Sequence, residues 1–144
     1  MSIATVLLVD DEQAFVDAMT KRLKRRDVDV RAAHSGQECL DVLASQPDLE
    51  VVVLDVKMPG MDGVETLKRI KTDFPLAEVI MLTGHATVET AIDGMKLGAF
   101  DYLMKPCDMD VLMEKIDAAA TKKRQHEEKI LEARAQSIAM RRGD

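Results

Sequence analysis

The chain has 144 residues, an apolar share of 47% and a formal net charge of −6. This size fits one domain, and the apolar share is large enough to build a core. The acidic charge and an aromatic content of 3% argue against a protein that binds a phosphate backbone or stacks on bases. We therefore expect no direct contact with nucleic acid, although residues 121–144 are net basic.

The two cysteines, Cys39 and Cys107, lack the spacing of a zinc site or of a disulfide framework. No apolar run approaches the roughly 18 residues of a membrane span. The start of the chain also lacks the positive region and apolar stretch of a signal peptide. We expect two structural cysteines, no membrane contact and a cytoplasmic protein.

Five short apolar runs predict β-strands. Residues 4–9, 51–54 and 79–82 are almost wholly apolar, which is typical of strands buried on both faces. Residues 28–33 are more polar and indicate an edge strand, and residues 101–104 form a short fifth run.

Apolar residues at helical spacing separate these runs. The four sets are Phe15, Met19 and Leu23; Leu40 and Leu43; Val64, Leu67 and Ile70; and Val88, Ala91, Ile92 and Met95. The alternation of strand and helix predicts an α/β fold with a parallel sheet covered on both faces. Because crossovers are right-handed, few windings remain, and the common one is the flavodoxin-like doubly wound sheet of five strands in the order 2-1-3-4-5.

A long helix is predicted to end the chain. Asp108 is a good N-cap, and no Gly or Pro follows before Gly143. The stripe expected to dock on the sheet is Val111, Leu112, Ile116 and Ala119. We expect a domain over residues 1–120 and a helical extension over residues 121–144.

The extension contains a further apolar seam, made of Ile130, Leu131 and Ile138. Charged residues between Lys122 and Lys129 interrupt this seam. A coiled coil needs a sustained repeat, so a homodimer through the C-terminal helix is left open.

Polar side chains gather where the predicted strands end. Asp10 and Asp11 follow the first strand, Asp55 the third, Thr83 the fourth and Lys105 the fifth. In this sheet order the switch point lies between the first and third strands, and ligands of open α/β sheets bind there. Each residue alone has a structural explanation, such as Asp11 or Thr83 as a helix N-cap. Together they indicate one site.

The residue types at these positions indicate phosphoryl chemistry. Three carboxylates at one site repel each other unless a cation lies among them. Oxygen ligands without nearby Cys or His suit Mg²⁺ rather than zinc. An Asp carboxylate can accept a phosphoryl group, and a Lys ammonium and a Thr hydroxyl can hold the transferred oxygens.

Four segments carry a family resemblance. They are LLVDDE at residues 7–12, VLDVKMPGMDG at residues 53–63, TGHA at residues 83–86 and YLMKP at residues 102–106. In order and spacing they resemble the receiver domain of response regulators in two-component signalling, over roughly residues 4–120. Residues 83–105 most resemble receivers of nitrogen-regulation-type enhancer-binding activators.

The resemblance implies roles for the residues at the strand ends. Asp55 would be the phosphoacceptor, and Mg²⁺ would be bound by Asp10, Asp11, Asp55 and the backbone carbonyl of Lys57. Thr83 would bond the phosphoryl group once it arrives.

Lys105 would pair with the phosphoryl group, and the bond before Pro106 would be cis, a form that X-Pro bonds adopt at low cost. Tyr102 would be the aromatic switch residue whose rotamer reports the state of Thr83. Lys57 and His85, two residues beyond Asp55 and Thr83 respectively, would tune dephosphorylation.

The resemblance also implies a switch rather than a turnover enzyme. A sensor histidine kinase would supply the phosphoryl group, and an unidentified protein would read the face made by the fourth helix, the fifth strand and the fifth helix. Phosphorylation would change the shape of this face.

Two alternatives compete with this interpretation. Residues beyond 120 are too few for a DNA-binding or ATPase domain, so we favour a stand-alone receiver with a protein–protein output. The chain could instead be the N-terminal receiver fragment of a longer transcriptional activator. A phosphatase-like hydrolase with an aspartyl nucleophile typically has Asp-x-Asp-x-Thr after the first strand, whereas residues 10–13 are Asp-Asp-Glu-Gln.

Overall fold

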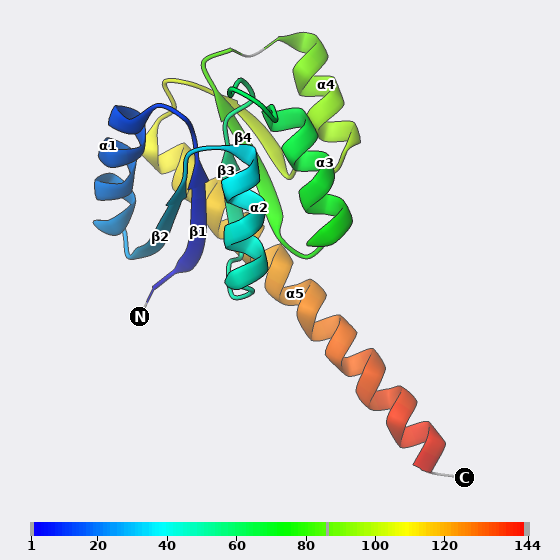
Figure 1. Cartoon of the computed structure of the whole chain (residues 1–144). Helices are drawn as coiled ribbons and strands as arrows, with labels where there is room; N and C mark the ends of the chain where they lie inside the picture. Colours follow the sequence, from blue (N-terminus) through cyan, green and yellow to red (C-terminus); the bar gives the residue numbers. More distant parts are fainter. Residues whose placement is uncertain (1, 86, 143–144) are drawn as a thin grey trace.

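The computed structural model describes residues 2–85 and 87–142, in which strands and helices alternate as predicted (Figure 1). The strands are β1 (Ala4–Val9), β2 (Val28–Ala33), β3 (Val51–Leu54), β4 (Glu78–Thr83) and β5 (Asp101–Met104). The helices are α1 (Gln13–Lys24), α2 (Gly36–Ser45), α3 (Gly63–Asp73), α4 (Val88–Lys96) and α5 (Met109–Arg142).

All strand pairs are parallel, and the sheet order is β2-β1-β3-β4-β5. The predicted fold class and strand order are therefore confirmed. β3 and β4 are buried along their whole length and β1 along nearly all of it, because helices cover both faces. β2 lies at an edge, where its polar residues Asp29 and Arg31 reach solvent.

Two apolar clusters fill the space between the sheet and its helices. On one face, Val16 of α1 and Leu112 of α5 pack with the strands. On the other, Leu40 of α2 and Leu67 of α3 do the same. Figure 1 shows α2 and α3 in front of the sheet and the start of α5 behind it. The carboxyl ends of the strands stay uncovered by either layer, so the loops there are free to form a site.

Helix α4 forms as predicted, but its apolar stripe is exposed. Val88, Ile92 and Met95 all reach solvent. The buried position of α4 is Gly94, and a Cβ added there would lie 3.6 Å from the ring of Tyr102. A helix that meets the sheet through a glycine buries little apolar area, so the side chains of the stripe are left on the surface.

Helix α5 has 34 residues and projects well beyond the sheet (Figure 1). Leu112, Ile116 and Ala119 are buried as predicted, but Val111 is 41% exposed and was wrongly placed in the same stripe. Successive helical residues point about 100° apart, so Val111 turns away when Leu112 faces the sheet. Within the residues that the structure describes, no helix is both long and apolar enough to span a bilayer.

Ion pairs attach α5 to the sheet beyond residue 120. The Arg124 guanidinium contacts Glu50 through two nitrogens, at 2.6 and 2.9 Å, and donates to the carbonyl of Ile3 at 2.7 Å. The ammonium of Lys122 lies 3.5 Å from the carboxylate of Glu78. A boundary between residues 1–120 and 121–144 stays a prediction, but contacts to the sheet continue to Arg124.

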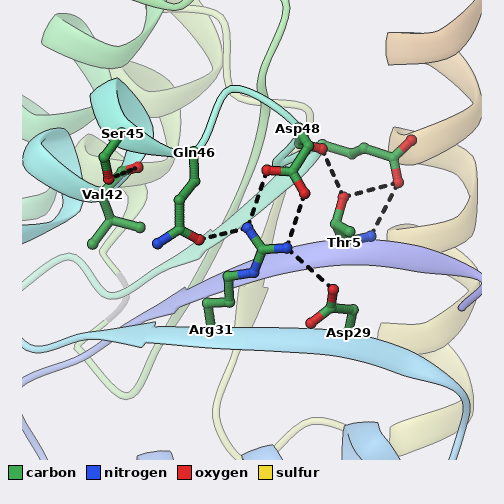
Figure 2. A network of polar contacts seen from close by, with 8 residues as sticks. Thr5, Asp29, Arg31, Val42, Ser45, Gln46 and Asp48 are labelled. Atoms are coloured by element: carbon green, nitrogen blue, oxygen red, sulfur yellow. Dashed lines mark hydrogen bonds and ion pairs between the residues drawn. The ribbon is translucent and has the colours of Figure 1, made fainter.

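A polar network joins the amino ends of β1, β2 and β3 (Figure 2). Arg31 on β2 donates to Asp48 at 2.9 Å and to Asp29 at 3.2 Å, and it also bonds Gln46. The hydroxyl of Thr5 donates to the carbonyl of Asp48 at 2.9 Å. This network links the strands to one another at the end of the sheet opposite to the predicted site.

Candidate functional site

The carboxyl ends of β1 and β3 place the acidic residues. The ladder continues one residue beyond each strand, since the N–H of Asp10 donates to Ala33 at 3.1 Å and that of Asp55 to Val9 at 3.0 Å. Asp10, Asp11 and Asp55 each offer a carboxylate oxygen, and these atoms lie within 4.8 Å of one another. The fold thus brings the three predicted acids together.

Two of these three residues are buried. Asp10 is 1% and Asp55 is 5% exposed, whereas Asp11 is exposed. Asp10 accepts from the N–H of Glu12 and Asp55 from the N–H of Val56, both at 2.9 Å. Buried carboxylates this close together repel unless positive charge compensates them. An all-oxygen donor set of this kind fits a hard divalent cation such as Mg²⁺.

Lys105 brings a positive charge to the acids. Its N–H donates to the carbonyl of Thr83 at 2.8 Å, which extends the β4–β5 ladder. Its ammonium lies 2.5 Å from a carboxylate oxygen of Asp10 and 3.8 Å from the ring centroid of Phe15. The predicted Lys105 therefore reaches the acidic cluster and pairs with Asp10.

Thr83 and Asp11 do not serve as helix caps. The hydroxyl oxygen of the buried Thr83 accepts from the N–H of His85 at 3.0 Å, and α4 is capped by Thr87. The N-cap position of α1 is occupied by Glu12, without a side-chain cap. The structural explanations that each residue has in isolation are therefore not realised.

A cavity of about 640 Å³ opens beside the acids. Its lining residues are Asp11, Glu12, Asp55, Lys57, Met58, Pro59, Gly84, His85 and Lys105. Lys57 and His85 are exposed at this cavity, so a small molecule or a partner's side chain can reach Asp55 from solvent past them.

The family model for the response regulator receiver domain matches residues 6–117. The chain belongs to this family. A receiver domain protein from Clostridium thermocellum, known from its crystal structure, has a TM-score of 0.81 at 35% identity, covering 85% of this chain and 98% of that one. The cluster at the strand ends thus lies in a receiver domain, a module of two-component signalling.

Similar sequences include regulators of the nitrogen-regulation type. An NtrX-like response regulator of Rickettsia bellii (strain RML369-C) is 38% identical over 115 residues, which are 78% of this chain and 24% of that protein. The DNA-binding transcriptional regulator NtrC of Klebsiella pneumoniae is 37% identical over 113 residues, with coverage of 78% and 24%. The predicted likeness to such receivers is confirmed, and the chain spans about a quarter of the length of these relatives.

In this receiver the predicted switch tyrosine is linked to the start of α4. Tyr102 is half-buried on β5, and its hydroxyl lies 2.7 Å from the hydroxyl of Thr90. Thr90 also forms a reciprocal capping box with Thr87. The Lys105–Pro106 peptide bond is cis. Thr90 was missed at the sequence level, because a Thr inside a helix shows no sign of a distant partner.

The sequence pattern did not predict the part that two further residues play in shaping the site. A Cβ on Gly63 would lie 2.1 Å from the backbone oxygen of Asp55, so α3 can begin here only with glycine. Gly63 belongs to the segment that resembles receivers, and that was its signal. Phe15 gave none, because its spacing with Met19 and Leu23 marks an ordinary core position.

Proposed function

We propose that this receiver is a phosphorylation-dependent switch in which Asp55 accepts a phosphoryl group from a sensor histidine kinase. One observation carries the proposal: buried Asp55 lies among Asp10, Asp11 and the ammonium-bearing Lys105 at an open cavity. Negative and positive groups arranged in this way suit the binding and neutralisation of a phosphoryl group. The closest functional class is therefore a phosphoacceptor rather than a turnover enzyme.

The transfer itself needs a nucleophile and a way to spread charge. A carboxylate oxygen of Asp55 attacks phosphorus, and the bond from phosphorus to the imidazole nitrogen of the donor breaks. The electron pair returns to that nitrogen, which takes up a proton. The ammonium of Lys105 and the hydroxyl of Thr83 would then contact the phosphoryl oxygens, which carry the added negative charge.

The metal ligands would be Asp10, Asp11, Asp55 and the backbone carbonyl of Lys57. A bound Mg²⁺ supplies positive charge that offsets the carboxylates and the phosphoryl oxygens. Asp10 and Asp55 support this assignment because they are buried side by side, which is unfavourable without such compensation.

The output would follow from the loop between β4 and α4. If Thr83 turns to the phosphoryl group, its bond from the N–H of His85 is lost. Tyr102, which bonds Thr90 near the start of α4, would change its contacts with that helix. Phosphorylation would then select one of two conformations of α4, β5 and α5.

A protein partner is supported by the surface of these three elements. Its exposed apolar residues are Val88, Ile92 and Met95 on α4, Met104 on β5 and Val111 on α5. Clusters of exposed apolar side chains mark interaction sites more often than isolated ones do. We infer that a downstream protein reads this face, while exposed Lys57 and His85 tune the access of water to phosphorylated Asp55.

Two forms of output are compatible with this proposal. A stand-alone receiver would act through protein contacts alone. A receiver at the start of a longer activator is supported by relatives such as NtrC, described as a DNA-binding transcriptional regulator. A homodimer through exposed Ile130, Leu131 and Ile138 on α5 would serve either form.

Intact mass spectrometry after incubation with acetyl phosphate and Mg²⁺ tests the acceptor. We expect one added phosphoryl group on the wild type and none on the Asp55→Asn variant. Asp41→Asn, an exposed change on α2, should behave like the wild type. A wild type that gains no mass, or an Asp55→Asn variant that does, would overturn the proposal.

A further inference from the structure

The side chain of Lys105 is held between two different partners. Its ammonium contacts the carboxylate of Asp10 at 2.5 Å and stands 3.8 Å from the ring centroid of Phe15. The second distance is well inside the roughly 6 Å range of cation–π attraction. Although lysine is usually a surface residue, the Lys105 side chain is only 17% exposed.

The ring itself has a fixed place. Phe15 lies in the first turn of α1 and is half-buried against the apolar cluster that α1 and α5 form with the sheet. The backbone of Lys105 is also fixed, by its bond to Thr83. What remains variable is the four-carbon stem between that backbone and the ammonium.

We propose that Phe15 is a positioning residue for Lys105. The ring keeps the ammonium next to the acids when these bind a divalent cation, so that it is in place for the phosphoryl group that reaches Asp55. This inference rests on the proposed function and adds to it a residue of α1 that touches none of the reacting atoms.

The two attractions respond differently to a cation. Once Asp10, Asp11 and Asp55 hold a divalent cation, the ammonium of Lys105 is repelled by a like charge and its attraction to Asp10 is offset. The attraction to the negative face of the Phe15 ring persists, because the ring carries no net charge that the cation could neutralise.

The surroundings leave space for the Lys105 side chain to move away from the acids. Lys105 and Glu12 line both the cavity at Asp55 and a second cavity of about 410 Å³, which is also lined by Phe15, Met19 and Cys107. Without the ring, the stem could turn into this second cavity or toward solvent. The ammonium would then spend less time near Asp55, and phosphoryl transfer would slow.

The test compares phosphorylation rates at saturating Mg²⁺ with acetyl phosphate, so that kinase docking plays no part. Phe15→Leu keeps an apolar side chain but removes the ring, and we expect transfer on the order of fivefold slower. Phe15→Tyr restores a ring and should restore the rate. Phe100→Leu removes the ring beside Lys122 instead and should leave the rate unchanged.

A second readout reports the contact directly. The ε-methylene protons of Lys105, assigned with a Lys105→Arg spectrum, should show an upfield ring-current shift in Mg²⁺-loaded wild type. This shift should disappear in Phe15→Leu and return in Phe15→Tyr. If Phe15 had a purely structural role, its loss would slow the reaction although the Lys105 protons of the Mg²⁺-loaded wild type showed no upfield shift.

The inference is overturned if Phe15→Leu reacts at the wild-type rate, or if the Lys105 protons of the Mg²⁺-loaded wild type show no such shift. The wild-type spectrum decides the contact even if the leucine variant does not fold. A wild type that takes up no phosphoryl group would overturn the proposed function instead, so the two failures are distinguishable.

Discussion

Buried polar side chains of this receiver lie in two different surroundings. Asp10 and Asp55 are buried in the acidic cluster, where the ammonium of Lys105 contacts Asp10. Cys39 is buried in the apolar cluster under α2, and desolvation raises the pKa of its thiol to about 12. Burial and then Asp108 also raise the pKa of Cys107. Both thiols are protonated at neutral pH, which fits structural roles.

The shifted pKa of Cys39 predicts a pH dependence of stability. The folded protein holds the thiol proton up to a pH of about 12, whereas the ordinary value is 9.0, so the stabilisation is complete below pH 9 and is lost as pH rises toward 12. At pH 10 the wild type should have lost about 1.4 kcal/mol more unfolding free energy than Cys39→Ala. Urea unfolding of both proteins from pH 8 to 10 measures this, and parallel curves would refute it.

At the scale of elements, α5 is attached to the sheet by charge as well as by apolar contacts. Arg124 binds Glu50 just before β3 and the carbonyl of Ile3 before β1. Burial alone would raise the pKa of Glu50, but the bonds from Arg124 and Thr5 together hold it below its ordinary value. These contacts of Arg124 with Glu50 and Ile3 therefore fix the direction in which α5 leaves the domain, at the end of the sheet opposite to the site.

Removing the ion pair between Arg124 and Glu50 should destabilise the domain in a pH-dependent way. Because the pKa of Glu50 is lowered in the fold, its stabilisation is present above the unfolded-state pKa and is lost as pH falls through the folded-state value. We expect Arg124→Ala to cost about 1 kcal/mol at pH 7, since the guanidinium is half-exposed, and less below pH 4. Urea unfolding tests this, with Arg134→Ala on the projecting helix as the control. Equal losses at both pH values would contradict the assignment.

For the whole molecule, the fold concentrates negative charge at one end of the sheet. The chain already carries a net charge of −6, and three of its acids meet at the carboxyl ends of β1 and β3. Bringing these acids together opposes folding, because the unfolded chain keeps them apart in water. A cation bound by the folded state alone would offset this cost.

Mg²⁺ should therefore stabilise the folded protein. At ten times its Kd we expect a gain of about 1.4 kcal/mol, which corresponds to a Tm increase of about 4 °C for a domain of this size. Calorimetry with Mg²⁺, followed by EDTA, measures the gain and its reversal. Asp11→Asn should lose most of it, and NaCl at equal ionic strength should not reproduce it. An increase that persists in Asp11→Asn would place the ion elsewhere.

Local patterns were sufficient to predict the fold and the acids of the site. A strand buried on both faces must be apolar throughout, so the strands could be found as short apolar runs. Parallel strands with right-handed crossovers leave few orders, and their carboxyl ends meet at one edge. The sequence by itself therefore determined that Asp10, Asp55 and Lys105 lie together, because each follows a strand directly.

Tertiary structure alone decided which side chains meet across elements. The contact of Phe15 with Lys105 joins α1 to the end of β5, and that of Thr90 with Tyr102 joins α4 to β5. The exposure of Val88 also depends on how α4 is seated, since helical spacing shows that one side is apolar but not that this side is buried. Such contacts depend on the approach of elements that are distant in sequence, and no local periodicity encodes that approach.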